Sequence, residues 1–418
     1  MPDQKSSDNL KNTAQSASPD GQVRQSESDL RTSGPVWDDS RLGWLGCAWF
    51  EKFGPRSLAK LQKTFGENGG IAAWQSGADG LLKAGLQEQP IRDFMAWRAA
   101  FDLERSKEIL AREGIDFVLP WDKLYPSVFK NSSCPPAALF WRGAPLAQRP
   151  WVAVVGTRKM SSYGKSATTQ IVSELVRAGA AIVSGLALGI DACAHQTALD
   201  NQGQTAAVLA GGLDQASLYP RNNLPLADRI LLSKGSLISE FAPGTPCYKG
   251  NFPQRNRLIA TLAQAVVVVE AGADSGSVLT AKLALEENRD VFAVPGPITS
   301  EGSIGVHELL RQGAQICTSG SDVLGSKQAQ PIVITPERPL TSEEIRILDL
   351  CRTPIHIDEL TRHMNSASAV MGAACTGLEL MGALQEMDGQ TYQLTPKGRQ
   401  LLQLSGGLSE PFRHSERR

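Results

Sequence analysis

Short aliphatic runs recur through the middle of the chain and are separated by stretches with helical periodicity. Such unbroken runs are typical of parallel strands buried on both faces, because a half-exposed strand would alternate apolar and polar residues. We therefore predict an α/β fold with a doubly wound parallel, Rossmann-like sheet, right-handed crossovers and helices on both faces. The expected strands are residues 152–155, 180–185, 205–212, 236–241, 265–271, 290–296 and 314–319.

The first strand ends at Gly156 and is followed by a polar loop and a helical segment from Gly164 to Ala178. A strand, a glycine turn and a helix in this order present free backbone N–H groups, which attract phosphate. Ligands of doubly wound sheets bind beyond the carboxyl ends of the strands. The loops after the strands are therefore the expected site. The alternative at this first loop is that Gly156 only permits the turn and Arg158 is a solvated charge.

These loops carry cations and aromatic rings. Gly156, Thr157 and Arg158 follow the first strand, Gly185 follows the second, and Arg221 follows the third. All of them are predicted to line a DNA-binding site.

The loop after the fourth strand, PGTPCYKGNFPQRNR, contains no acid. Its cations are Lys249, Arg255 and Arg257, and its rings are Tyr248 and Phe252. This mixture suits single-stranded nucleic acid, because cations hold the backbone and each exposed base that stacks on a ring contributes about 1–3 kcal/mol. A duplex hides its base faces and would leave the rings unused.

Two residues near these loops have structural alternatives. Arg257, which with Asn256 begins a predicted helix, could cap that helix or pair with a glutamate at a strand end. His195 could be a catalytic base, but Asp191 lies four residues earlier on one helical face, which favours a structural hydrogen bond between them.

Motifs for cofactors and catalysis are missing from the sequence. No GxGxxG or GxxxxGK[ST] pattern occurs, so we expect neither a dinucleotide cofactor nor an ATP motor. The seven cysteines form no CxxC pair and no histidine lies at metal-ligand spacing, so we expect no metal site and no disulfide framework. No nucleophile lies at a credible spacing from a base. The chain is therefore expected to have no catalytic residue, no cofactor and no enzymatic activity.

Charge and hydropathy set further limits. The formal net charge of the 418 residues is −1, so an anionic partner must be held by a local basic patch. No run of about 18 apolar residues and no apolar signal core occur, so we expect a cytoplasmic protein with no membrane partner.

Helical segments precede the sheet. Residues 1–36 lack large apolar side chains and are predicted to be a disordered tail. Residues 37–114 are predicted to form a small helical domain of the SAM or helix-hairpin-helix type, and the sheet domain is predicted at 115–325. The segment from Lys52 to Ser57, KFGPRS, resembles a helix-hairpin-helix turn, whose backbone amides can face a nucleic-acid phosphate. A purely structural corner is the alternative.

A second small domain follows the sheet. After a linker at 326–340, residues 341–400 read as three helices and a hairpin with Asp388-Gly389 at its turn, which predicts a winged-helix-like domain. The third helix contains no Lys or Arg, so we favour a structural or protein-contact role over DNA reading. Residues 401–418 are predicted to be a flexible tail.

Nine motifs between residues 150 and 325 resemble the DNA-processing protein A family, also called DprA or Smf. They are VVGTR, SGLALGIDACAH, GGLD, YPRNN, SEFAPGTP, GNFPQRNRLIA, VVVVEA, SGSVLTA and DVFAVPGP. The resemblance implies a single-stranded DNA-binding protein of natural transformation. Such a protein protects incoming DNA and helps the RecA recombinase load onto strands covered by single-strand-binding protein. The family is not known for enzymatic activity.

The resemblance also implies roles for individual residues. DNA would be contacted by Arg158, Arg221, Lys249 and Phe252, which are also singled out by charge and stacking. Two departures from the family pattern occur: a threonine stands at 157 where serine is usual, which keeps the hydroxyl, and Leu188 replaces a lysine, which removes a cation.

The family forms homodimers through the far end of its Rossmann-like domain. By position that surface would include Leu285, His307 and Ile316, although the same pattern is compatible with a core.

Two other functions stay open. A nucleotide-phosphate hydrolase of the lysine-decarboxylase-like Rossmann group would have a similar sheet, but the loop EAGADSGSVLTA lacks the glutamate of that group's PGGxGTxxE motif. A protein-interaction scaffold could use the basic loop to bind an acidic partner.

Overall fold

The computed structural model describes residues 37–325, 340–387 and 389–404. The predicted tail at 1–36, most of the predicted linker, Asp388 of the predicted hairpin turn and residues 405–418 lie outside these ranges. By its internal contacts the chain divides into two units. Of the described residues, the first contains 37–142, 212–215 and 240–245, and the second contains 143–211, 216–239, 246–325, 340–387 and 389–404.

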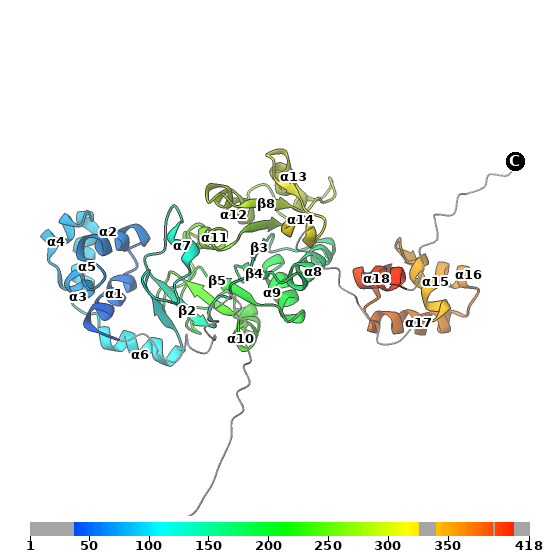
Figure 1. The fold of residues 1–418 in the computed structure, drawn as a ribbon, viewed down its shortest axis with the longest axis horizontal. Coiled ribbons are helices and arrows are strands. Elements are labelled where there is room, and N and C mark those ends of the chain that lie inside the picture. The colour runs from blue at the N-terminus through cyan, green and yellow to red at the C-terminus, as the bar shows by residue number, and fades with distance from the viewer. Residues whose placement is uncertain (1–36, 326–339, 388, 405–418) are drawn as a thin grey trace, which may run out of the picture. The chain divides into compact units, whose positions relative to one another are not determined.

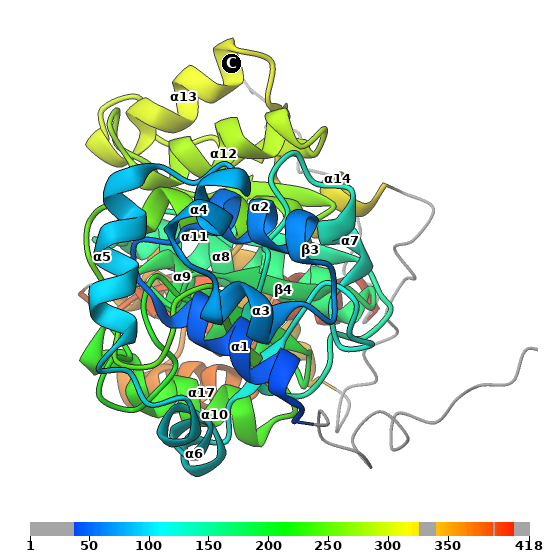
Figure 2. The ribbon, with the colours of Figure 1, turned by 90° about the vertical axis from the view of Figure 1, so that its left-hand side faces the viewer.

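Helices make up most of the first unit (Figure 2, blue to cyan). Aromatic side chains join them: the ring of Phe50 lies 4.9–5.3 Å from those of Phe53, Phe94 and Trp97, centroid to centroid. Buried pairs of this kind contribute about 0.5–1.5 kcal/mol each beyond their area. The predicted N-terminal helical region is confirmed. Its helices are α1 (Asp39–Trp49), α2 (Pro55–Phe65), α3 (Gly70–Gln75), α4 (Ala78–Lys83), α5 (Glu88–Arg98) and α6 (Leu103–Glu113).

The first unit also contains a short antiparallel strand pair, in which Phe117 lies opposite Phe140. Both phenylalanines are fully buried. The elements of this part are β1 (Asp116–Val118), α7 (Ser127–Lys130) and β2 (Leu139–Gly143).

Seven strands of the second unit run parallel in the order β6-β5-β4-β3-β7-β8-β9. The chain moves outward from β3 to β6 and then returns to β7, so its direction reverses between β3 and β7. Such a reversal marks the crevice in which doubly wound sheets bind ligands. The strands are β3 (Trp151–Val155), β4 (Ala181–Ser184), β5 (Thr205–Val208), β6 (Ser236–Ser239), β7 (Ala265–Val268), β8 (Asp290–Ala293) and β9 (Gln315–Ile316).

Helices cover both faces of this sheet (Figure 1). One face carries α8, α9 and α10, and the other carries α11, α12 and α13, while α14 packs on α8. The predicted doubly wound α/β fold is confirmed. The helices are α8 (Ser162–Arg177), α9 (Ile190–Asp200), α10 (Leu224–Leu232), α11 (Asn251–Leu262), α12 (Gly276–Glu286), α13 (Ile304–Arg311) and α14 (Gly320–Leu324).

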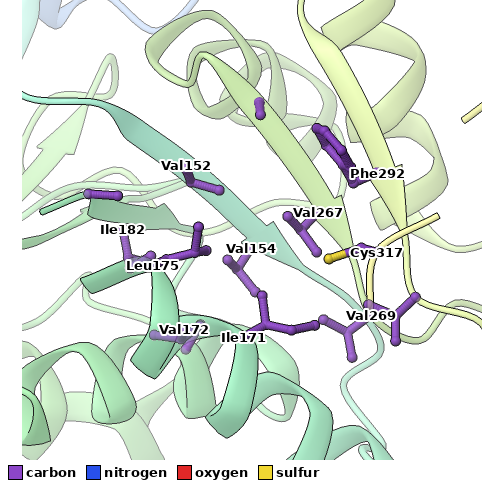
Figure 3. Packing of buried hydrophobic residues seen from close by; sticks show 14 of the residues in the cluster. Val152, Val154, Ile171, Val172, Leu175, Ile182, Val267, Val269, Phe292 and Cys317 are labelled. Carbon is purple, nitrogen blue, oxygen red and sulfur yellow. The ribbon is translucent and has the colours of Figure 1, made fainter. Parts of the chain in front are cut away.

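A core between β3 and α8 holds the first strand-end loop in place (Figure 3). Val152 and Val154 share one face of β3 because alternate strand residues point the same way. They belong to the same cluster as Ile171, Val172 and Leu175 of α8, and all five side chains are at most 2% exposed. Burying each contributes about 1.5–3 kcal/mol. The turn that joins β3 to α8 therefore starts and ends on rigid elements.

Residues 340–387 and 389–404 form the predicted winged-helix domain, which has a hydrophobic core of its own. Its three strands are ordered β10-β12-β11. The three helices and the hairpin are confirmed, whereas β10 and α18 were not predicted, and α18 includes residues 401–404 of the predicted tail. The elements are α15 (Ser342–Leu350), β10 (Ile355–His356), α16 (Ile357–Met364), α17 (Ser368–Leu380), β11 (Leu384–Met387), β12 (Thr391–Leu394) and α18 (Pro396–Leu404).

Candidate nucleic-acid interface

The glycine turn after β3 packs against the loop after β7 and the start of α9. The backbone N–H of Thr157 donates to the carbonyl oxygen of Glu270 (2.7 Å). A Cβ atom at Gly156 would lie 2.5 Å from Cγ1 of Ile190, so only glycine allows this approach. Gly156 and Thr157 thus anchor the turn, and Arg158 is its first exposed side chain.

A carboxylate of the protein closes the N-terminus of α8. Glu270 accepts a hydrogen bond from the backbone N–H of Ser161 (3.0 Å) and another from its hydroxyl, which itself accepts from the N–H of Gly164 (3.0 Å). Glu270 is 5% exposed. A ligand phosphate therefore cannot take the position that it occupies at the first helix of dinucleotide-binding sheets. A phosphate that enters this crevice must be bound by other groups than the first N–H groups of α8.

Arg158 lies over the ring of Phe252, which comes from the first turn of α11. The guanidinium carbon is 4.8 Å from the ring centroid. At exposed sites such a cation–π contact contributes about 0.5–1 kcal/mol. It brings an exposed cation and a partly exposed ring together from two different strand ends.

Arg255 does not reach the surface, in contrast to its predicted place on the DNA backbone. It is 4% exposed, and Nη1 donates to the carbonyl oxygen of Val208 (2.9 Å). The predicted helix start at Asn256 is also wrong, because α11 begins at Asn251. Residue 255 therefore lies one turn inside the helix, on the face that meets the sheet. Its guanidinium carbon, 5.7 Å from the ring centroid of Phe252, supports that ring instead.

Gly185 makes room for this buried arginine. A Cβ atom at Gly185 would lie 1.6 Å from Nη1 of Arg255, and the Gly185 N–H donates to Oδ2 of Asp191 (3.1 Å). Burial raises the pKa of the Asp191 carboxyl, while the charge of Arg255 acts in the opposite direction. Gly185 is itself buried and has this packing role, and it also belongs to the wall of a small pocket next to Phe252.

His195 is a structural residue, but its partner differs from the prediction. Its Nδ1 lies 2.7 Å from the hydroxyl of Thr205, and Asp191 is engaged by Gly185. Burial, with a smaller contribution from Arg255, lowers the pKa of His195 to about 3, so the ring is neutral. The expected His195–Asp191 hydrogen bond is therefore wrong.

Exposed cations and rings lie on the loops around Phe252. Lys249 lies two residues before α11 and is exposed, and its side chain makes no hydrogen bond or ion pair with any residue that the structure describes. Arg221 is exposed at the start of a 3₁₀ turn. Two tyrosines, Tyr219 and Tyr248, are about half exposed, at 51% and 53%. The predicted site residues do not include Tyr219, although its place directly before Pro220 and the predicted Arg221 could have indicated that it lies at the site.

Two pockets flank the Arg158–Phe252 contact. The larger, of about 390 Å³, also has Asn256 and the first residues of α12 in its wall. The smaller, of about 30 Å³, includes Tyr219 and Cys247. Arg158, Phe252 and Arg255 line both pockets, so of the predicted residues these three are central, with Arg255 in the buried part of the walls. Cys247 was not predicted, and no sequence signal distinguished it from the other cysteines.

The remaining predicted residues lie elsewhere. Arg257 is partly buried and is absent from the walls of both pockets. Leu285 and Ile316 are 55% and 60% exposed. Nε2 of His307 lies 3.0 Å from the carbonyl oxygen of Gly296. The two apolar residues are thus available at the surface, whereas His307 has an internal partner.

Within the described ranges, no group of three or more His, Cys, Asp or Glu residues is arranged to hold a metal ion. In the same ranges, the helices are too short or too polar to cross a membrane.

Sequence profiles and solved structures place the chain among known proteins. The profile described as DNA recombination-mediator protein A matches residues 116–328, and the DprA winged helix domain matches 334–390. Protein Smf of Synechocystis sp. is 35% identical over 298 residues, which cover 69% of this chain and 73% of that protein. DNA processing protein DprA of Streptococcus pneumoniae is 43% identical over 217 residues, 50% of this chain and 71% of that protein.

The X-ray structure of DNA processing protein A from Streptococcus pneumoniae aligns with a TM-score of 0.59 at 34% identity, over 69% of this chain and 98% of that one. The family profile alone spans half of the sequence. The chain therefore belongs to the DNA-processing protein A (DprA/Smf) family.

Proposed function

We propose that this protein binds single-stranded DNA at the loops that follow β3, β5 and β6. The observation that carries the proposal is the meeting of exposed cations with a ring at one edge of the sheet. Arg158 lies over Phe252, and Lys249 is exposed three residues before that ring. Arg221, Tyr219 and Tyr248 extend the same combination of charge and stacking surface.

Unpaired DNA fits this surface better than a duplex. A ring gains about 1–3 kcal/mol from an exposed base face, and every base has one, so binding is expected on any sequence. The backbone of the strand would lie on Arg158, Lys249 and Arg221. Arg255 and Gly185 would act indirectly, since they fix the position of Phe252 from beneath.

We further propose that the protein is a mediator and not an enzyme. Membership of a family described as DNA recombination-mediator proteins supports this role. In natural transformation it would protect incoming single strands and help RecA load onto strands covered by single-strand-binding protein. His195, the candidate base near the strand ends, is fully buried, and its pKa of about 3 makes it a weak base, which supports binding without chemistry.

The proposed active form is a homodimer. Leu285 and Ile316 are large apolar side chains that are more than half exposed, as an unpaired interface would require. Sedimentation of the wild type and of Ile316→Glu compares their masses. A wild-type monomer at micromolar concentration would contradict the proposal.

Affinity for an oligo-dT strand, measured across salt concentrations, tests the binding site. Arg158→Ala and Lys249→Ala should each weaken binding and reduce the slope of log affinity against log salt by about 0.7, the value for one phosphate contact on a single strand. Lys282→Ala is the matched control, since it removes an exposed cation of α12 outside both pockets. Wild-type affinity and slope in both site variants would refute the site.

Phe252→Leu separates stacking from charge. Leucine keeps apolar bulk but offers no ring, so affinity should fall about 5- to 150-fold with an unchanged salt slope, while Phe252→Tyr retains affinity. RecA loading is a separate measurement on strands covered by single-strand-binding protein. If the protein binds DNA tightly but does not accelerate RecA loading, the result would support the binding proposal and contradict the mediator role. Release of free base from nucleoside monophosphates would instead indicate a hydrolase.

A further inference from the structure

A second cationic surface lies on the first unit, outside the site described above. Residues 52–66 contain four cations and no acid, although the whole chain has 42 Lys and Arg against 43 Asp and Glu. Three of these cations lie in α2, namely Arg56, Lys60 and Lys63. These three residues are called the α2 stripe below. Positive charge is thus concentrated locally in a chain that is nearly neutral as a whole.

Helical spacing puts the stripe on one face of α2. Its members follow one another at intervals of four and three residues, which brings side chains together on a helix surface. All three are exposed, while Leu58 and Leu61 of the same helix are 7% and 0% exposed on the opposite side. The buried leucines fix the rotation of α2, so the cations cannot turn inward.

The N-terminus of α2 adds to the same surface. Gly54 precedes the helix and provides no side-chain hydrogen bond to its first turn. A Cβ atom at Gly54 would meet no atom within 4 Å, so this end of the helix is open. The aligned peptide dipoles give a helix N-terminus a partial positive charge. Arg56 lies in that first turn, where the N–H groups of Ser57 and Leu58 already donate to the carbonyl oxygen of Gly54 (2.9 and 3.1 Å).

Most of the charge of the stripe is not neutralised within the protein. Arg56 and Lys63 make no ion pair or side-chain hydrogen bond with the residues that the structure describes. Nζ of Lys60 donates to the carbonyl oxygen of Gly85 (2.8 Å), which positions the ammonium without cancelling its charge. Lys52 differs, because it pairs with Asp93 (2.7 Å), and it is therefore left out of the stripe.

We propose that the α2 stripe binds the phosphate backbone of duplex DNA. From Arg56 to Lys63 the helix rises by seven residue steps, or about 10 Å along its axis at 1.5 Å per residue. Along one strand of a duplex, phosphates follow at about 3.4 Å of axial rise. Three cations over this length can therefore face about three consecutive phosphates of one strand.

The lack of exposed rings favours a duplex over a single strand at this surface. Phe53, just before α2, is 3% exposed and packs against Phe50 and Phe94. No ring in the fully described stretch 52–66 is among the exposed large side chains. A surface that offers only charge and a helix N-terminus can hold a backbone but cannot stack bases. It therefore differs in kind from the loops around Phe252.

The test measures binding of a short blunt duplex by the full chain. All proteins in the comparison carry Lys249→Ala and Phe252→Ala, so that the proposed single-strand site is weakened equally in every one of them. Adding Arg56→Ala, Lys60→Ala and Lys63→Ala should reduce the slope of log affinity against log salt by about 2.7, or 0.9 per phosphate contact. Between about 50 and 200 mM salt the background protein should then lose about 40-fold more affinity than the stripe variant.

A matched control removes the same charge elsewhere on the same unit. Arg105→Ala, Lys107→Ala and Arg112→Ala take three cations from α6, where acids alternate with them, and should leave the slope unchanged. A second variant, with Arg56→Lys, Lys60→Arg and Lys63→Arg, keeps the charge and should keep the slope, which excludes misfolding as the cause of a loss.

An equal effect of the α2 and α6 variants would overturn the proposal, as would a stripe variant with the slope of the background protein. Loss of binding to polyglutamate without loss of binding to the duplex would also overturn it and would point to an acidic protein partner. Oligo-dT binding by the stripe variant in the otherwise wild-type chain should be unchanged. Failure of the single-strand proposal and failure of this one are therefore distinguishable.

Discussion

At the scale of single residues, a buried arginine organises the candidate site. Arg255 contacts the ring of Phe252 from inside, lies against Gly185, and is electrostatically coupled to Asp191. Its Nε has no hydrogen-bond partner in the described part of the chain. A buried charge costs several kcal/mol unless its neighbours compensate it. The residues that surround Arg255 should therefore tolerate little change.

Gly185→Ala tests this dependence. The added methyl would lie 1.6 Å from Nη1 of Arg255, so the arginine or β4 must move, and we expect the free energy of unfolding to fall by about 1–3 kcal/mol. Gly250→Ala is the control, because its Cβ meets nothing within 4 Å and its backbone is already helical. Urea denaturation compares the two variants. Equal stabilities would show that Arg255 is not held as tightly as the contacts indicate.

His195 should make stability depend on pH in the acid range. Its pKa is about 3 in the folded protein, whereas an exposed histidine has an ordinary pKa of 6.5. Between these values the unfolded state binds the proton and the folded state does not. The contribution of neutral His195 to the free energy of unfolding is therefore complete above pH 6.5. It decreases as the pH falls, by about 1.4 kcal/mol per pH unit.

His195→Gln removes this titration. The difference in unfolding free energy between wild type and variant should be constant above about pH 7 and should change in favour of the variant between about pH 6 and 4. Urea denaturation at several pH values measures it. A difference that stays constant throughout would mean that the folded ring takes up its proton as easily as the unfolded one.

At the scale of elements, the sequence predicted which segments are strands better than where they end. The run at 205–212 was expected to be one strand, but β5 ends at Val208. The N–H of Leu209 still donates to the carbonyl oxygen of Ile238 in β6 (2.8 Å), and Ala210 continues as a loop residue that is 4% exposed. An aliphatic run reports burial, and burial does not require ladder hydrogen bonds. Strand ends therefore could not be read from hydropathy alone.

The start of α11 was missed for a related reason. Nδ2 of Asn251 donates to the carbonyl oxygen of Ala210 (3.0 Å), a contact from a distant part of the chain that fixes where the helix begins. The sequence identified Lys249, Phe252 and Arg255 as cations and rings of one loop. Which of them face outward depends on that helix start, so the burial of Arg255 was not predictable from composition.

The hydrogen bonds between Glu270 and Ser161 at the start of α8 lead to a prediction about the stability of this element. Glu270→Gln removes the charge that faces the N–H and hydroxyl of Ser161 and the positive end of the helix. Since charge-assisted hydrogen bonds contribute about 1.5–3 kcal/mol, we expect a loss of stability of that order. Glu286→Gln, at an exposed position at the end of α12, is the control and should change stability by less than about 0.5 kcal/mol. Thermal and urea denaturation measure both.

At the scale of the whole molecule, the winged-helix domain is a self-sufficient element of the chain. It buries its own cluster of side chains, including Leu348, Leu360 and Leu378. Its third helix, α17, contains neither Lys nor Arg, so it lacks the cations through which a recognition helix holds DNA. The residues proposed to bind a single strand all belong to the sheet and its loops.

A chain that ends at residue 325 should therefore bind oligo-dT with nearly the affinity of the full chain. The cut must follow α14, because the N–H of Gly320 donates to the carboxylate of Glu174 in α8 (2.6 Å) and this contact supports the sheet. Fluorescence anisotropy should show a change of less than about threefold and an unchanged salt slope, because no phosphate contact is lost. Introducing Arg158→Ala into the shortened chain should weaken binding as much as it does in the full chain. A tenfold or larger loss on shortening alone would mean that the winged-helix domain, despite its lack of cations on α17, contributes directly to the single-strand site.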